Sequence, residues 1–146
     1  KSFFTNNVSY LTQNIFLLDE NVARNVAFAD ENIDFEEVSK NLYLSNFPHS
    51  KKNQVIQKTI GDNGIKLSGG QRQRLAIARL LYENNNFSIL DEFDNALDSK
   101  NIRIISKLFF QNNDKTIIFS THNKELLKNA DKVYEFKNNN LIKLTL

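Results

Sequence analysis

Glycine is confined to one short segment of this chain. The four glycines among its 146 residues all fall between Gly61 and Gly70. Because glycine tolerates left-handed backbone and close approaches that other residues do not, this distribution indicates that the segment needs a bare or strained backbone. It also means that the phosphate-binding loop G-x-x-x-x-G-K-[ST] does not occur in this sequence.

The second half of the glycine segment, Leu67-Ser-Gly-Gly-Gln-Arg-Gln-Arg74, begins a predicted helix that runs to about Tyr82. Ser68 followed three residues later by Gln71 is a capping-box pattern. The free N–H groups and the dipole at such a helix start favour an anion, most often phosphate. A bare Ser-Gly-Gly would more simply be an ordinary helix cap. The whole octapeptide is more specific, and it resembles the signature motif of the ATP-binding-cassette (ABC) ATPases.

Composition narrows the class of protein. The formal net charge of +2 argues against a dedicated nucleic-acid binder, which needs a basic face, so we expect no nucleic-acid partner. The absence of cysteine excludes disulfides, thiolate metal sites and a cysteine nucleophile. No apolar run is longer than four residues, which is too short for a transmembrane helix.

Hydrophobic periodicity predicts strands that alternate with helices. The predicted elements are a β-prone run at 8–11, helices at 21–28, 34–44 and 68–82, a strand at 87–90, a helix at 99–110, a strand at 116–120, a short helix at 124–129, and a hairpin with strands at 132–136 and 141–144. This order indicates an α/β fold with a mainly parallel sheet. We expect residues 21–82 to form a mostly helical subdomain, and residues 1–20 and 83–146 to belong to the α/β core.

Two adjacent acids end the predicted strand Phe87-Ser-Ile-Leu-Asp-Glu92. A strand that ends in this way places its acids at the ligand edge of an α/β sheet. Asp91 could then hold Mg²⁺, and Glu92 could act as general base on a water molecule. Taken alone, an acidic turn after a strand is an equally good interpretation. The segment also resembles the Walker B strand of the ABC ATPases, which favours the catalytic interpretation.

Three further segments resemble motifs of that family. Asn95-Ala-Leu-Asp98 stands at the spacing of the D-loop, with Phe93-Asp94 replacing the usual small pair before it. His122 resembles the switch histidine, although a lone histidine there would more simply be a surface or capping residue. Tyr10-Leu-Thr-Gln13 resembles the Q-loop, whose glutamine contacts Mg²⁺ and water in the family.

Two other segments resemble the exporter branch of the family. Residues 14–28 are similar to the pattern that follows the exporter Q-loop, and Ile60-Gly-Asp-Asn-Gly64 is similar to the exporter X-loop, with Asp62 in place of its usual glutamate. In exporters this loop touches the coupling helices of the transmembrane partner. Leu17-Leu18-Asp19 favours exporters of lipid-oligosaccharides or peptides.

The resemblance covers essentially the whole chain and implies its fold. We expect a P-loop NTPase-like sheet of the ABC ATPase type, incomplete at the N-terminus, with a mostly helical signature subdomain. The P-loop of the family lies upstream of the Q-loop. We therefore expect this chain to be the C-terminal part of a nucleotide-binding domain that binds ATP poorly by itself.

The resemblance also implies roles for individual residues. In the family, two domains face each other head to tail, and the signature of one closes over ATP held by the other. Residues implied to contact ATP from the partner's side or across the interface are Ser68, Gly69, Gly70, Gln71 and Asp98. Residues implied to act on the chain's own side are Gln13, Glu92 and His122 in catalysis, with Asp91 and Gln13 at Mg²⁺.

The expected cofactors are ATP and Mg²⁺. The expected partners are a second nucleotide-binding domain, identical or different, and transmembrane domains that precede this segment in the same polypeptide. The expected location is the cytoplasmic face of a membrane, the bacterial inner membrane by preference.

Three functions remain open at this point. The first is ATP hydrolysis coupled to export. The second is a non-transport ABC ATPase, but relatives with long coiled coils insert hundreds of residues where only about fifty separate Gln13 from Leu67 here. The third is a truncated chain that acts only as an interaction module. The intact acids and histidine argue against that third function, whereas the absent P-loop favours it.

Overall fold

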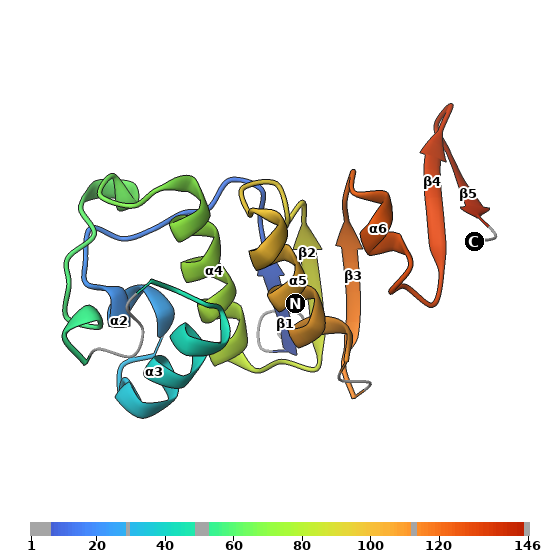
Figure 1. The fold of residues 1–146 in the computed structure, drawn as a ribbon. Helices are drawn as coiled ribbons and strands as arrows, with labels where there is room; N and C mark the ends of the chain where they lie inside the picture. Colours follow the sequence, from blue (N-terminus) through green and yellow to red (C-terminus); the bar gives the residue numbers. More distant parts are fainter. Residues whose placement is uncertain (1–6, 29, 49–52, 112–113, 145–146) are drawn as a thin grey trace.

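The computed structural model describes residues 7–28, 30–48, 53–111 and 114–144. Its strands and helices in chain order are β1 (Val8–Leu11), α2 (Val22–Val26), α3 (Phe35–Leu44), α4 (Gly69–Glu83), β2 (Phe87–Asp91), α5 (Ser99–Phe110), β3 (Thr116–Ser120), α6 (Lys124–Leu127), β4 (Val133–Lys137) and β5 (Asn140–Leu144). The helices α2, α3 and α4 lie at one end of the molecule, the sheet and α5 in the middle, and β4 and β5 at the other end (Figure 1).

The central sheet is parallel, with strand order β1-β2-β3. Parallel strands need a crossover connection. The helical segment supplies it between β1 and β2, and α5 supplies it between β2 and β3 (Figure 1). Leu11 is paired with Leu90, and Asp91 with Ser120, so the carboxyl ends of all three strands lie at one edge. The prediction of an α/β fold with a parallel sheet is confirmed.

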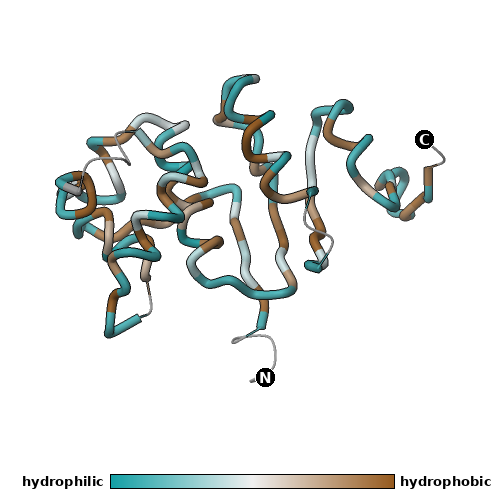
Figure 2. Tube along the Cα trace, turned by 60° about the horizontal axis from the view of Figure 1, so that its bottom comes forward, coloured by the Kyte–Doolittle hydropathy of each residue, from teal (hydrophilic) through white to brown (hydrophobic). Residues whose placement is uncertain are grey.

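Helix α4 packs against both halves of the described structure. Its Leu75 and Ala78 belong to a hydrophobic cluster with α2 and α3, whereas its Ala76, Ile77 and Leu80 belong to a second cluster with β2 and α5. Hydrophobic residues alternate with hydrophilic ones along the elements, and the turns between them are mostly hydrophilic (Figure 2). This two-sided packing sets the start of α4 relative to the sheet. The division at residues 21–82 stays a prediction.

The glycine segment adopts the backbone that its composition predicts. Gly61 and Gly64 have φ angles of 77° and 68°, in the left-handed region. Gly61 precedes a 3-10 turn, η2 (Asp62–Gly64), and Gly64 is its last residue. A Cβ atom at Gly64 would lie 2.6 Å from Cδ1 of Leu17. Glycine is therefore needed there both for its backbone conformation and for its missing side chain.

Most predicted elements agree with the structure within one or two residues. Helix α2 is shorter than the predicted 21–28, because the chain leaves helical geometry at Ala27, whose ψ angle is 43°. The predicted hairpin is present, with β4 antiparallel to β5. Among the described residues, no helix has both the length and the apolar composition needed to cross a membrane.

Candidate active site

The ends of β2 and β3 are tied together by one hydroxyl group. Ser120 Oγ donates a hydrogen bond to Asp91 Oδ1 (2.7 Å) and accepts one from the backbone N–H of Glu92 (3.0 Å). Glu92 follows β2 with a left-handed φ angle of 47°. A non-glycine residue held in this region signals a constraint from its surroundings. The two acids therefore stand in a cross-linked turn at the carboxyl edge of the sheet.

The carboxylate of Glu92 brings the three predicted catalytic residues together. Gln13 Nε2 donates to Glu92 Oε2 at 2.7 Å, and His122 Nε2 lies 3.1 Å from Glu92 Oε1. The amide of Asn95 also donates to Glu92 Oε2. Gln13, Glu92 and His122 follow three neighbouring parallel strands, and for this reason residues far apart in the sequence meet at one edge.

The predicted capping box at the start of α4 is present. Ser68 Oγ accepts from the backbone N–H of Gln71 (3.3 Å), and Gln71 Oε1 accepts from the backbone N–H of Ser68 (2.8 Å). The N–H groups of the first helical turn, which include those of Gly69 and Gly70, have no acceptor within the helix. The positive end of the α4 dipole is therefore available to an anion.

The first two turns of α4 pack on the segment that joins β2 to α5. Gln73 Nε2 donates to the backbone carbonyl of Phe93 at 2.9 Å. A Cβ atom at Gly70 would lie 2.9 Å from the carbonyl oxygen of Ala96. Among the described hydrogen bonds, none joins the Ser68–Gln71 turn to the carboxylate of Glu92. The start of α4 thus packs on the segment that directly follows the two acids.

Asp98 acts as the N-cap of α5. Its carboxylate accepts from the backbone N–H of Asn101 (2.8 Å) and from Asn101 Nδ2 (2.9 Å). The bond from the Asn101 N–H is the largest cause that holds the pKa of Asp98 below its ordinary value, and Arg74 adds a smaller attraction. Asp98 is therefore ionised at neutral pH and is engaged in the fold.

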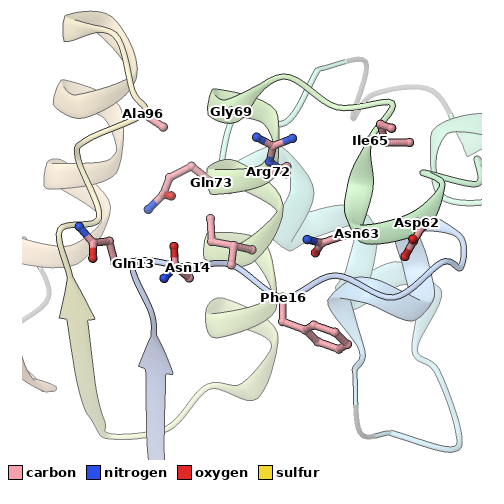
Figure 3. Close-up of a pocket in the computed structure, with 11 residues that line it drawn as sticks. Gln13, Asn14, Phe16, Asp62, Asn63, Ile65, Gly69, Arg72, Gln73 and Ala96 are labelled. Atoms are coloured by element: carbon pink, nitrogen blue, oxygen red, sulfur yellow. The ribbon is translucent and has the colours of Figure 1, made fainter.

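An open cavity of about 760 Å³ lies between the Gln13 side of the sheet and η2. Figure 3 shows its walls: Gln13, Asn14 and Phe16 from the segment after β1, Asp62, Asn63 and Ile65 from η2 and the residues after it, Gly69, Arg72 and Gln73 from α4, and Ala96. Gln13 lines this cavity and also bonds to Glu92. One side chain therefore connects the cavity to the acids.

A sequence model described as ABC transporter matches residues 1–95 of this chain. The chain belongs to the ABC transporter family. Over 134 residues it is 37 % identical to the ATP-dependent lipid A-core flippase of Cupriavidus pinatubonensis, covering 88 % of this chain and 23 % of the flippase. Over 132 residues it is 39 % identical to the ATP-dependent lipid A-core flippase of Haemophilus influenzae, and the match covers 87 % of this chain and 22 % of that flippase.

A solved structure supports the same assignment at the level of the fold. A bacterial Atm1-family ABC exporter with ATP bound superposes with a TM-score of 0.88 at 22 % identity, covering 96 % of this chain and 25 % of that one. This ABC transporter chain thus spans about a quarter of the length of these relatives. The prediction of part of an exporter-type nucleotide-binding domain is confirmed.

The donor set of this ABC transporter chain fits Mg²⁺ only together with a phosphate ligand. Within the described residues, no three His, Cys, Asp or Glu side chains cluster as metal ligands. Magnesium usually binds through one or two carboxylates, with waters and substrate phosphates completing its shell. A carboxylate such as that of Asp91, cross-linked at the sheet edge, suits this kind of coordination.

The structure brings to this site residues to which the sequence assigned no role, among them Ser120, which bonds to both acids, and the pair Phe93-Asp94. The sequence marks Phe93-Asp94 only as a replacement of the usual small pair before the D-loop, yet both residues are buried. Phe93 makes edge-to-face contacts with Phe109 and Phe119, and Asp94 accepts a hydrogen bond from Thr121. The sequence did contain a signal for these roles, because Phe93 is a large aromatic residue and Asp94 a third acid at positions where the family has small residues.

Proposed function

We propose that the intact protein to which this nucleotide-binding segment belongs hydrolyses ATP and couples the hydrolysis to export. The observation that carries the proposal is the convergence of Gln13 and His122 on the carboxylate of Glu92. The side chain of Glu92 is 18 % exposed, so a water molecule can reach its carboxylate. A carboxylate held in place by two neighbouring groups can accept a proton from a water molecule that is hydrogen-bonded to it.

The proposed reaction is attack of water on the terminal phosphoryl group of ATP. Glu92 takes a proton from the water, the water oxygen forms a bond to the γ-phosphorus, and the bond to the ADP oxygen breaks. Gln13 orients the water, and the exposed imidazole of His122 donates a hydrogen bond to the γ-phosphate. Mg²⁺, which Asp91 and Gln13 would hold, offsets negative charge on the phosphates.

The start of α4 is proposed to act on a nucleotide held by a second domain. Gly69 and Gly70 present backbone N–H groups and the positive end of a 15-residue helix, while Ser68 and Gln71 hold this turn through the capping box. Asp98 is proposed to lie at the same domain interface. The exposed positive end of α4 supports this proposal, because each turn would then complete the other domain's site.

The cavity beside Gln13 is proposed to receive a helical segment of the transmembrane domains. Phe16 and Ile65 on its walls are 62 % and 78 % exposed, so a partner would bury apolar surface there. A partner that moves in this cavity would move Gln13 and thereby the Glu92 site. We further propose that the chain works at the cytoplasmic face of a membrane and, because its relatives are lipid A-core flippases, that the intact protein moves a lipid cargo.

The decisive test is Glu92→Gln in the full-length parent. We expect the variant to bind ATP while steady-state hydrolysis falls about 100-fold or more, since the amide cannot accept the proton. Glu125→Gln is the matched control, because Glu125 pairs with Lys128 on the surface of α6. Hydrolysis retained in the Glu92 variant would exclude Glu92 as the base.

The genomic context gives an independent test. A reading frame upstream of Lys1 that encodes a P-loop and apolar helices would support export by one polypeptide. A start codon at that point would instead favour an interaction module.

A further inference from the structure

His122 needs a structural element that holds it against Glu92. Its side chain is 87 % exposed and contacts Glu92 Oε1 at 3.1 Å. An exposed side chain samples several rotamers, and ordering it costs entropy. The position of the imidazole therefore depends on the backbone between the end of β3 and the start of α6.

The hydroxyl of Thr121 organises that backbone. Thr121 Oγ1 accepts a hydrogen bond from the backbone N–H of Asn123 at 2.9 Å, and this bond spans His122. Asn123 in turn caps α6, because its Oδ1 accepts from the backbone N–H of Glu125 at 3.1 Å. The loop that carries His122 is thus closed on both sides of the histidine.

The same hydroxyl ties the loop to Asp94, in the segment that follows β2. Thr121 Oγ1 lies 3.0 Å from Asp94 Oδ1 and 2.9 Å from Asp94 Oδ2, and it donates its proton to that carboxylate. Asp94 is 7 % exposed. A hydrogen bond to a buried ionised acceptor is stronger than a neutral one, and losing its donor leaves the acceptor unsatisfied. This contact therefore anchors the loop firmly.

Asp94 itself is held by its neighbour in the chain. Phe93 is fully buried, and its ring stands edge-to-face with Phe109 and Phe119, at centroid distances of 5.7 and 6.1 Å. Two acids separated by one anchored aromatic residue therefore contact two consecutive residues of the facing loop. Glu92 contacts His122, and Asp94 contacts Thr121.

We propose that Asp94 and Thr121 are positioning residues that place the imidazole of His122 at the carboxylate of Glu92. This inference rests on the proposed function, because the position of His122 affects turnover only if the Glu92 site hydrolyses ATP. Neither residue touches the reacting atoms. Both act through the His122 loop.

The first test is Thr121→Val in the full-length parent, a change that keeps the shape of the side chain and removes the hydroxyl. We expect kcat for ATP to fall about ten-fold with KM changed by less than about two-fold. Thr121→Ser restores the hydroxyl and should recover most of kcat. Thr116→Val, at the opposite end of β3, is the matched control and should leave kcat unchanged.

The second test separates positioning from general support of the fold. In a His122→Ala background, Thr121→Val should cause no further loss of kcat, because the group that it positions is gone. An equal loss in both backgrounds, or an unchanged kcat for Thr121→Val alone, would overturn the inference. Asp94→Asn gives a parallel measurement if Thr121→Val reduces the yield of folded protein, and it should lower kcat in the wild-type background only.

Failure of the proposed function is distinguishable from failure of this inference. If Glu92→Gln still hydrolyses ATP, the proposed function fails, whatever the Thr121 variants do. If Glu92→Gln is inactive and His122→Ala is impaired while Thr121→Val is normal, the proposed function stands and the positioning pair is wrong.

Discussion

Gly69 and Gly70 are neighbours in the signature turn, but the structure constrains them differently. A Cβ atom at Gly70 would lie 2.9 Å from the backbone carbonyl oxygen of Ala96, whereas at Gly69 it would meet only Ala96 Cβ at 3.8 Å. The first distance forces a rigid backbone group to move, and the second is an ordinary van der Waals contact. Only Gly70 is therefore needed for the close approach of α4 to the D-loop segment.

This difference predicts unequal effects of two otherwise identical substitutions. Gly70→Ala should lower the free energy of unfolding by about 1–3 kcal/mol, the usual cost of overpacking. Gly69→Ala should leave it unchanged or raise it by up to about 1 kcal/mol, since alanine favours the helix. Denaturant unfolding of both variants measures the difference. Equal stabilities would contradict the close approach at Gly70.

A second prediction at the level of single residues concerns the imidazole of His122. Its Nε2 lies beside the carboxylate of Glu92, and the side chain is otherwise open to a ligand. His122→Ala in the full-length parent should lower kcat about 100-fold, because a group that contacts Glu92 and is proposed to contact the γ-phosphate is lost. Steady-state ATPase measurements check this. An unchanged rate would refute the switch role.

At the level of elements, the end of α4 is tied to the segment that begins α3. The hydroxyl of Tyr82 donates to Asp30 Oδ2 at 2.8 Å and accepts from the backbone N–H of Asp34 at 3.2 Å. Asp34 is itself the N-cap of α3. The bond from Tyr82 is the largest cause that holds the pKa of Asp30 below its ordinary value of 3.8. Stability at this contact should therefore depend on pH.

We expect Tyr82→Phe to be less stable than the wild type at neutral pH. Because the pKa of Asp30 is lowered in the folded state, its ionised carboxylate stabilises the fold at pH values above the ordinary pKa of 3.8. That contribution is lost as the pH falls through the lowered pKa. The difference in Tm between variant and wild type should therefore shrink in acid. Tyr10→Phe, which alters an exposed tyrosine of β1, is the control. A difference that stays constant with pH would show that Asp30 is not the partner that matters.

At the level of the whole molecule, this sequence contains the signature, Walker B and switch residues but no P-loop. The groups proposed to act on a terminal phosphate converge on Glu92, but this sequence lacks the P-loop that would cradle a triphosphate. Binding of ATP by the 146-residue chain should therefore be too weak to stabilise it.

The 146-residue chain should change its Tm by less than about 1 °C in millimolar ATP, because a ligand whose concentration is well below its Kd adds almost no stability to the fold. A thermal shift assay measures this, with the full-length parent as positive control. A clear rise in Tm that depends on ATP concentration would contradict the prediction.

Local pattern was enough to predict the secondary structure of this chain. The predicted strand at 116–120 and helix at 99–110 match β3 and α5, because hydrophobic periodicity and caps act over a few residues. The capping box of Ser68 and Gln71 was likewise readable from a three-residue spacing. The family assignment rested on motifs of the same local kind.

The tertiary structure alone decided which side chains of the site touch. Gln13 and His122 contact Glu92, Ser120 contacts Asp91, and Thr121 contacts Asp94. Gln13 and Glu92 are 79 positions apart, and Asp94 and Thr121 are 27 apart. No periodicity spans such distances. The order and register of the parallel strands bring their carboxyl ends to one edge, and only then do Gln13 and His122 reach Glu92 while Asp94 reaches Thr121. Sequence thus determined which chemical groups are present, and strand pairing determined which of them touch.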